Sequence, residues 1–557
     1  MLYDRFAKKR LYSIVCGLAC LCSWAGCTQH NYKKEADEQV YHIIDQKWQD
    51  DFGSKVNYRI SDVTPSPNDI QIAKAVPASG VLSLPAAVAL ATAHNRDYQT
   101  QKELLYTMAL DLRLIRHIFE TQFFGGVSGG YDSDWNDQVA GLEANLGFNR
   151  LLKTGTFIST RISNAWLKVL SGNMEGGMAT VLTATVTQPL LRGSDPRVVT
   201  ENLTQAERDA LYQIRLFNRY RKSFVVSVIT QYYQVLELYK QTKIAEDNYN
   251  TIAWLSERVE KLSNAGRLPT LELDRMHQEK LVARDLYVQA EKEYGTVLDL
   301  FKITLGVKPT TEFRLDESNL ETLKTAGMNY PDFSESDAVE TALYQRLDLT
   351  NSADAVIDEQ RKVYVAADAL GADLNIIGTT NVASEQQGSR QTMQAADDYT
   401  LDFELNLPFD RVVEQNVYRK ALIILNQRQR EYELAADTIR MEIRQAYRDL
   451  KEATERYRLQ SEGLSLAQKR FEKTFLLMQY ARASSRRVLD AQNAFFDAQN
   501  EATDALTDYA IATLNFYRDS GILQVRPDGM WEIGDVKKPV LSGFSFVGDS
   551  SRSDIEQ

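Results

Sequence analysis

The fold of this chain is decided by a stretch that occurs twice, first as SLPAAVALATAHNRD at Ser83–Asp97 and again as SESDAVETALYQRLD at Ser334–Asp348. The matching residues lie at one constant offset, with Ala87, Val88, Ala91 and Asp97 falling on Ala338, Val339, Ala342 and Asp348. Internal repeats set the architecture of a whole chain. Two copies, each on the order of 200 residues, are too few and too large for a solenoid. The repeat therefore predicts a doubled unit that closes around an axis.

Outward from these stretches, each copy changes from helix-like to strand-like sequence at matching positions, Gln122 and Asp373. Apolar and polar residues then alternate over Leu142–Phe148, Thr156–Ile162 and Ala179–Gln188 in copy one, and over Leu374–Ala383 and Leu401–Leu407 in copy two. Alternation with a period of two predicts strands. Polar side chains at every second position suit a membrane barrel with a wet lumen. They suit a soluble sheet with one wet face equally well, so the strands alone leave both possibilities open.

A very long helical stretch follows a proline in each copy, after TVTQPLL at Thr185–Leu191 and after ELNLPFD at Glu404–Asp410. Arg197–Ala265 contains neither Gly nor Pro over 69 residues. As one helix it would be about 100 Å long. In copy two, residues of one stripe recur in steps of four and three: Tyr432, Ala436, Ile439, Ile443, Ala446, Leu450, Ala453 and Tyr457. This heptad spacing predicts that the helix packs beside its neighbours in a left-handed coil.

Both long helical stretches are predicted to break once, near the middle. In copy one, Gly266 indicates a helix C-terminus and Pro269 a new start. In copy two the same bend falls near Gln479–Arg487, which contains neither glycine nor proline. Each copy should therefore be a strand pair from which a long helical hairpin extends.

The first 27 residues contain all four cysteines. A basic start at Lys8-Lys9-Arg10, an apolar run over Leu11–Cys22 and small residues before Cys27 describe a secretory signal. Ala25-Gly26-Cys27 resembles a bacterial lipoprotein box, in which the cysteine becomes the acylated N-terminus. The alternative is ordinary signal cleavage near Ala25. We expect residues 1–26 to be the signal peptide, Cys27 to be lipidated, and residues 27–81 to be a polar tether.

Composition excludes several classes of function. The net charge is −12, acids and bases are interspersed, and no basic stripe is available for phosphates, so nucleic acid is excluded as a partner. The five histidines have no ligand spacing, and neither a phosphate-binding loop nor an H-E-x-x-H motif occurs. We expect no enzyme activity, no cofactor and no metal site. No segment after the signal has eighteen uninterrupted apolar residues, so no transmembrane helix is predicted.

Four features of the chain belong together: the lipoprotein-like cysteine, the doubled helix–strand–strand–helix unit, the Q-P-L-L and L-P-F-D segments, and Val488-Leu489-Asp490-Ala491 after the helical turn. In this combination the chain resembles the TolC-type outer membrane efflux proteins. The resemblance covers roughly Leu82–Leu523 and implies a mainly α-helical fold with membrane β-strands. It implies a homotrimer in which four strands per chain close a twelve-stranded barrel in the outer membrane, continued by a long helical barrel through the periplasm. It also implies two partners, a periplasmic adaptor protein and an inner-membrane pump that supplies the energy.

The resemblance places a periplasmic gate at the helical turns. The matching positions at the copy-two turn are Tyr480, Arg482, Arg486, Arg487 and Asp490, and those at the copy-one turn are Gly266, Arg267 and Asp274. Exposed ion pairs contribute only about 0–1 kcal/mol each, so a docking partner could break them. For any single one of these residues, a solvated charge at a hairpin tip is the simpler interpretation.

The resemblance gives two repeats, 82–325 and 326–523, followed by a polar tail at 524–557. Copy one departs from the family because of the extra hairpin-like stretch at Leu142–Ile162, for which we expect an extracellular or lumenal insertion. An alternative to a channel is an elongated coiled-coil periplasmic scaffold lipoprotein whose strands form a soluble sheet.

Overall fold

The structure is a computed structural model, and it describes residues 29–49, 52, 55–63, 76–133, 138–171, 177–326, 334–387, 390–393, 398–407, 409–480, 482–526 and 531–533. The chain divides into two compact units. Unit 1 contains Met1–Trp48, Leu104–Ile214 and Ala355–Arg428, and unit 2 contains Gln49–Glu103, Arg215–Asp354 and Gln429–Gln557. The expected signal peptide, residues 1–26, and the expected lipidation site Cys27 lie outside the described residues.

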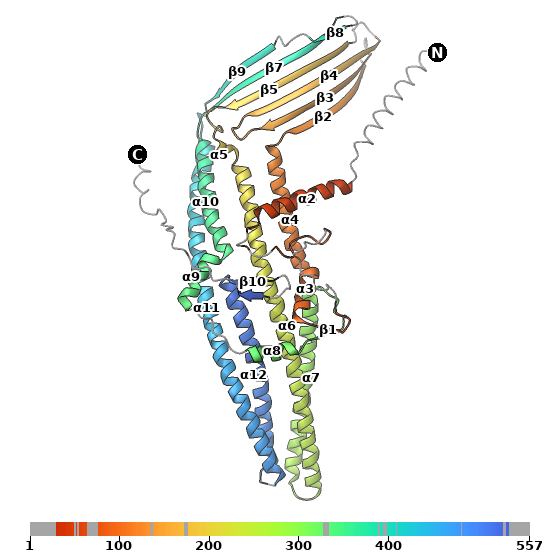
Figure 1. Ribbon diagram of the computed structural model, residues 1–557, viewed down its shortest axis with the longest axis vertical. Helices are drawn as coiled ribbons and strands as arrows, with labels where there is room; N and C mark the ends of the chain where they lie inside the picture. Colours follow the sequence, from red (N-terminus) through yellow and green to blue (C-terminus); the bar gives the residue numbers. More distant parts are fainter. Residues whose placement is uncertain are drawn as a thin grey trace, which may run out of the picture. The chain divides into compact units, whose positions relative to one another are not determined.

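Unit 1 contains a seven-stranded antiparallel sheet (Figure 1). Its strands are β2 (Gln122–Ser133), β3 (Gln138–Leu151), β4 (Phe157–Ser171), β5 (Gly177–Pro189), β7 (Asp373–Gln387), β8 (Arg390–Met393) and β9 (Asp398–Asn406). The order is β2-β3-β4-β5-β7, and β8 and β9 both pair with β7, at Ser384–Gln387 and Asp373–Asn381. Since Ser384 pairs with both β5 and β8, the two short strands share the edge of β7 that lies away from β5. The sheet is therefore six strand positions wide.

The helical part of unit 1 is held by polar contacts. It contains α2 (Gln29–Lys47), α5 (Pro196–Val199) and the adjoining segments of α4 (Arg96–Ile118), α6 (Glu201–Asn264), α10 (Leu347–Asp368) and α11 (Val412–Gln479). Asp358 of α10 is buried and accepts from the Tyr212 hydroxyl of α6 at 2.6 Å. Arg208 of α6 and Arg361 of α10 also pair with it, at 2.5 and 2.8 Å. Because its charge is shared by these partners, the carboxylate can be buried.

Unit 2 is built mainly from two helical hairpins. One joins α6 to α7 (Thr270–Thr304), and the other joins α11 to α12 (Ser485–Asp519). Around them lie α3 (Leu84–His94), α8 (Ser318–Ala326), α9 (Glu335–Gln345), the parallel pair β1 (Val81–Leu82) and β6 (Arg314–Leu315), and the antiparallel pair β10 (Leu523–Val525) and β11 (Trp531–Ile533). In the described part of the chain, no helix combines the length and the apolar character needed to span a membrane.

The predicted heptad seam of α11 is confirmed by its burial. Its inner positions, Ala436, Ile439, Ile443, Ala446, Leu450 and Ala453, are all buried. The two end positions, Tyr432 and Tyr457, are partly buried, and the Tyr457 ring stacks on Tyr509 of α12 with ring centroids 6.3 Å apart. Small alanines between larger residues allow the hairpin helices to approach each other closely.

The repeat is confirmed at the level of single residues. Helices α3 and α9 begin and end at equivalent positions, offset by 251 residues, and the strands β2 and β7 begin at the same offset. The returning helices α7 and α12 both have 35 residues. Each is followed by a glycine in the left-handed region, Gly306 at φ 73° and Gly521 at φ 83°. Both copies therefore enter the sheet and leave the returning helix at matching places, although the strands between these points differ in number.

The predicted number of strands is wrong. The stretch that we expected to be an insertion forms β3 and β4, which pair along their full length between β2 and β5. Each chain thus supplies six strand positions and not four, and a twelve-stranded barrel from three chains does not follow.

The segment expected to be a tether is only partly described, and some of its described residues are packed and not free in solvent. Helix α2 buries Val40, Tyr41, Ile43 and Ile44 on one face. In unit 2, Phe52, Val56 and Tyr58 are almost fully buried. In the tail, Trp531 lies 5.9 Å from the Tyr517 ring of α12.

Candidate functional site

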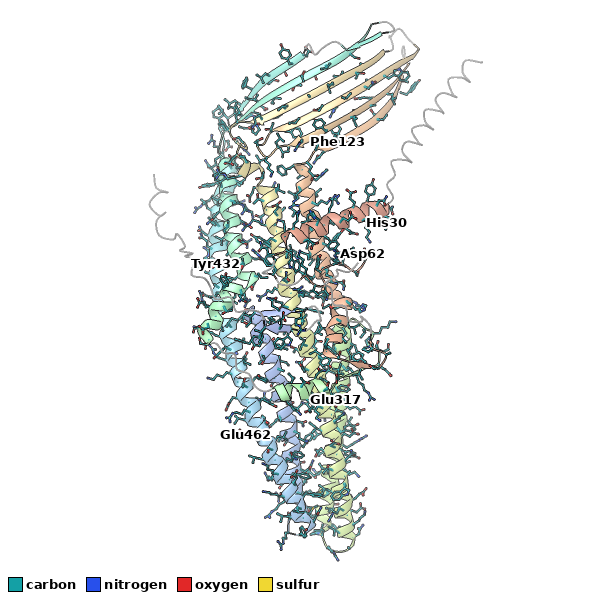
Figure 2. All side chains as sticks on the ribbon, in the orientation of Figure 1. His30, Asp62, Phe123, Glu317, Tyr432 and Glu462 are labelled. Atoms are coloured by element: carbon teal, nitrogen blue, oxygen red, sulfur yellow. The ribbon has the colours of Figure 1, made fainter. Side chains whose placement is uncertain are left out.

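One face of the unit 1 sheet is apolar and exposed. Directly paired residues of an antiparallel sheet share a face, and one such row contains Gly125, Leu146, Ile162, Leu182 and Val382. The exposed large apolar side chains on this face are Phe123, Val127, Tyr131, Leu142, Leu146, Ile162, Trp166, Val186, Tyr399, Leu401, Phe403 and Leu405. Phe123, at the start of β2, is 79% exposed and is labelled in Figure 2. Among the exposed large apolar residues in the described strands of this sheet, Phe157 alone faces the other way.

The opposite face of the sheet is polar. It carries Glu143, Asn145, Asn149, Ser159, Arg161, Thr183, Thr185, Asn375, Asn381, Asp398, Asp402 and Glu404. Thr183 donates to Asn381 at 2.9 Å across the junction between the two repeats. The register therefore places most apolar side chains on one face and most polar side chains on the other, and the polar pair Asn164 and Thr180 on the apolar face is joined by a hydrogen bond of 3.1 Å. Such a division suits a sheet between an apolar medium and water.

A glycine on the polar face makes room for an aromatic ring. Gly147 pairs with Phe124 on one side and with Arg161 on the other. A Cβ at Gly147 would lie 2.6 Å from the Phe124 ring and 2.3 Å from the Thr160 carbonyl oxygen. Phe124 therefore lies across the glycine, and the Arg161 guanidinium is 5.6 Å from its ring centroid.

The two hairpin turns of unit 2 use the same hydrogen bond. After α6, the Arg267 N–H donates to the Leu262 carbonyl at 2.9 Å, and Gly266 has φ 71°. After α11, the Arg482 N–H donates to the Leu477 carbonyl at 2.8 Å, although the sequence has no glycine there. Such a six-residue closure satisfies the last carbonyl groups of a helix. The predicted break in copy two is thus confirmed without its usual residue.

The hairpins are joined just behind their tips. Ser485 of α12 donates its hydroxyl to Glu272 of α7 at 3.0 Å. An apolar cluster lies beside this contact and draws on both hairpins: Ile252, Leu255, Val259, Met276, Ala283, Val488 and Leu489. Because it contains residues of α6, α7 and α12, this cluster fixes the two tips to each other within unit 2.

All the gate candidates lie at the surface of these tips. Tyr480, Arg482, Arg486, Arg487 and Asp490 are exposed around the second turn, and Gly266, Arg267 and Asp274 are exposed around the first. Their neighbours Val488 and Leu489 point inward instead. Within the described part of this single chain, no ion pair joins the candidate charges to one another. The structure brings them to the same end of unit 2 and leaves them available for contacts with other chains.

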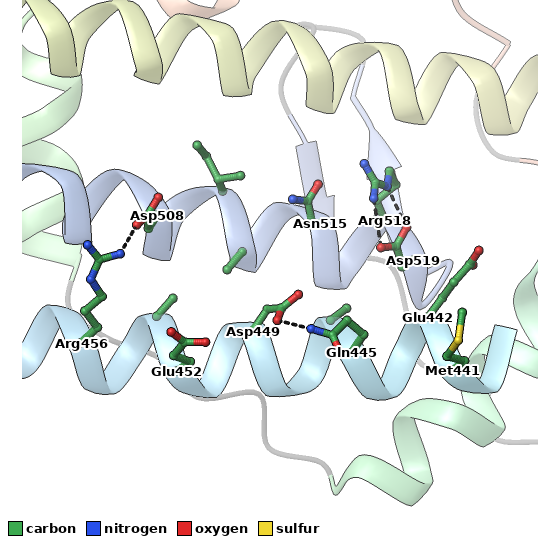
Figure 3. A pocket seen from close by; sticks show the side chains of 14 residues that line it. Met441, Glu442, Gln445, Asp449, Glu452, Arg456, Asp508, Asn515, Arg518 and Asp519 are labelled. Atoms are coloured by element: carbon green, nitrogen blue, oxygen red, sulfur yellow. Dashed lines mark hydrogen bonds and ion pairs between the residues drawn. The ribbon is translucent and has the colours of Figure 1, made fainter. Parts of the chain in front are cut away.

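A groove of about 510 Å³ lies between α11 and α12 in unit 2 (Figure 3). It has an excess of acidic side chains, since Glu442, Asp449, Glu452, Asp508 and Asp519 line it together with two arginines, Arg456 and Arg518. Arg456 bridges the two helices by an ion pair with Asp508 at 2.7 Å. Sequence reasoning missed this groove, although the alanines of the α11 seam that form part of its lining were recognised.

A partly buried acid lies nearby on α6. Burial, together with the negative charges of Asp504 and Asp508, raises the pKa of Glu237 to about 8. Asp504 also accepts from the Gln241 amide at 2.5 Å. Glu237 is therefore protonated at neutral pH in the folded protein.

Comparison with known proteins shows which fold this is. No protein-family model and no curated protein matches the chain. Among solved structures, the CmeC outer membrane channel of Campylobacter jejuni is similar with a TM-score of 0.57 and 14% identity, covering 81% of this chain and 87% of CmeC. The open state of the MtrE outer membrane channel of Neisseria gonorrhoeae has a TM-score of 0.54 and 13% identity, with 83% and 96% covered. CusC, described as forming a transmembrane channel, has a TM-score of 0.57 and 16% identity, with 79% and 92% covered.

These structures are outer membrane channels, and the chain shares their fold over most of its length. The resemblance to TolC-type proteins is confirmed at the level of the fold.

Proposed function

We propose that this chain is the outer membrane channel of a tripartite efflux or type I secretion system, through which substrates pass passively to the exterior. The observation that carries the proposal is the exposed apolar face of the sheet, with a polar face behind it. Soluble proteins rarely expose a contiguous apolar patch larger than a few hundred Å². Lipid against the apolar face and water against the polar face account for both.

Several copies would form the channel, and three is the number that the resemblance implies. Within unit 2, helix α7 exposes Leu281 and Val288, and α11 exposes Leu434 and Met441 and, further on, Leu459 and Leu466. The two members of each pair are seven residues apart, which is the spacing of a coiled-coil seam. These stripes support a homotrimer in which helices of neighbouring chains pack on each other.

The gate of this channel would lie at the hairpin tips. The exposed arginines Arg482, Arg486 and Arg487, with Asp490, would contact the same tips of neighbouring chains across the axis, together with Tyr480. On the first turn, Gly266, Arg267 and Asp274 would complete the ring. Such exposed pairs are weak, on the order of 1 kcal/mol or less, so an adaptor that docks on the tips could open them.

The remaining assignments follow from the same proposal. The partners are a periplasmic adaptor protein at the tips and the inner-membrane pump behind it. An acyl chain on Cys27 would anchor the protein in the outer membrane, from which it extends into the periplasm.

The alternative is a periplasmic scaffold lipoprotein. It would leave the apolar face of the sheet in water, so the exposed face argues against it.

The test is the state of the full chain in outer membrane fractions. We expect a band that migrates as a trimer in SDS without heating and as a monomer after heating, and we expect ion conductance in planar bilayers. A monomer in the soluble periplasmic fraction would refute the proposal.

A further inference from the structure

The sheet of unit 1 has two open edges, and the directions of their strands would allow one edge to pair with the other edge of a second copy. One is β2, and the other is β9, continued by β8 (Figure 1). In the described chain, neither has a partner on its outer side. Successive strand positions are antiparallel and six in number, so β2 and β9 run in opposite directions. An edge of one copy can therefore continue the ladder of another copy in the antiparallel sense.

The chain itself shows what such a junction looks like. The end of copy one meets the start of copy two where β5 pairs with β7, and Thr185 lies opposite Thr379. By the repeat, β2 is equivalent to β7 at the offset of 251, and Ser128 therefore matches Thr379. The prolines of TVTQPLL and ELNLPFD align β5 with β9, and Glu404 therefore matches Thr185.

We propose that β9 of one copy pairs with β2 of the next copy, head to tail, and that the ring holds eighteen strands, six from each of three copies. This inference rests on the proposed trimeric channel. Repeating the β5–β7 register sets Glu404 opposite Ser128 of the next copy. The hairpin β3–β4 then belongs to the wall itself.

The faces of the two edges agree in this register. On the apolar face, Phe403 falls opposite Gly129 of the next copy, and Leu405 falls opposite Val127. On the polar face, Asp402 falls opposite Gly130, where a side-chain atom meets nothing within 4 Å in the single chain. Large side chains laid across glycines on a neighbouring strand are a known way to fill an edge. No apolar residue is forced onto the polar face.

The added strands widen the opening. With strands about 4.8 Å apart and tilted by about 40°, eighteen strands give a barrel about 36 Å across, compared with about 24 Å for twelve. The cross-sectional area is then about 2.2 times larger. Barrels of sixteen to eighteen strands commonly enclose an aqueous channel.

The experiment joins the two edges by a disulfide in the full-length protein. The variant Glu404→Cys/Ser128→Cys should, on oxidation, give a ladder ending at a covalent trimer that reducing agent dissolves. The matched control is Glu404→Cys/Gly125→Cys, in which the second cysteine lies on the other face of β2 and should give no ladder. The single variants report any cross-link through Cys27 or the other native cysteines. Electron cryomicroscopy of the purified unmodified trimer then counts the strands.

Eighteen strands with β9 beside β2 of the next copy is the expected result. A conducting trimer with twelve strands, or with β3–β4 outside the wall, would overturn this inference and leave the proposed function intact. A chain that is monomeric and does not conduct would overturn both.

Discussion

Leu146 offers a sharp test of which medium covers the sheet. It lies near the middle of β3, on the apolar face, and is 65% exposed. If water covers this face, Leu146→Arg changes the free energy of unfolding by no more than about 0.5 kcal/mol, as for most surface substitutions. If lipid covers it, a charge at this depth costs about 2–4 kcal/mol. The two readings thus differ by more than tenfold in the equilibrium between folded and unfolded protein.

The matched control is Asn145→Arg, because Asn145 is the adjacent residue on the polar face of the same strand. Both variants would be unfolded by urea in lipid vesicles, with the folded fraction followed by the heat-dependent shift in SDS gels. We expect Leu146→Arg to lower the urea midpoint strongly and Asn145→Arg to change it little. Equal midpoints for the two variants would show that lipid does not contact this face.

Three further variants test other parts of the structure. Since the folded protein keeps the proton of Glu237 (pKa about 8) while the unfolded chain loses it near pH 4.5, this stability is full below pH 4.5 and lost as pH rises through 8. Glu237→Gln should therefore flatten the fall of the thermal midpoint, followed by circular dichroism, with a gain that grows from pH 4.5 and reaches on the order of 4 kcal/mol at pH 8. An unaltered pH profile would contradict the burial of this proton. Gly147→Ala should destabilise the sheet by about 1–3 kcal/mol, because the added methyl group would meet the Thr160 carbonyl oxygen. The control Gly130→Ala has open space for its methyl group and should cost less. Equal urea midpoints for the two variants would refute the close approach of the Gly147 backbone to Thr160. Arg486→Glu should make the channel leaky in planar bilayers, and unchanged conductance would remove Arg486 from the gate.

The helical framework could be predicted because its signals are local. The repeated stretches at Ser83 and Ser334 begin helices whose bounds agree to the residue. The heptad seam of α11 was visible because its buried positions recur on one helix. The break after α6 had Gly266 as a marker, and the break after α11 was found from its equivalence to the first.

The place of β3 and β4 could not be predicted, for a physical reason. Their alternation was visible in Leu142–Phe148, but alternation does not say which strand pairs with which, and that pairing decides whether a hairpin lies inside a sheet or outside it. Helix α2 was missed because only a narrow face, at Val40 and Ile44, is buried in an otherwise polar segment. The location of the tip arginines could be predicted from the turn, but their ionic partners could not, because in the proposed assembly these partners would belong to other chains.

The hairpin β3–β4 also bears on how such chains can change over time. A hairpin adds two strands, so the chain returns to the end of the sheet from which the hairpin started. The chain can therefore go from the end of β2 to the start of β5 at one end of the sheet, with or without the hairpin between them. Helix α7 that follows has the same 35 residues as its counterpart α12, and α6, with 64 residues, is four residues shorter than α11, with 68. The number of strands in the sheet can therefore change independently of the helical hairpins. Gain or loss of a gene segment that encodes a single β-hairpin could alter the width of the sheet and leave the helical hairpins unchanged.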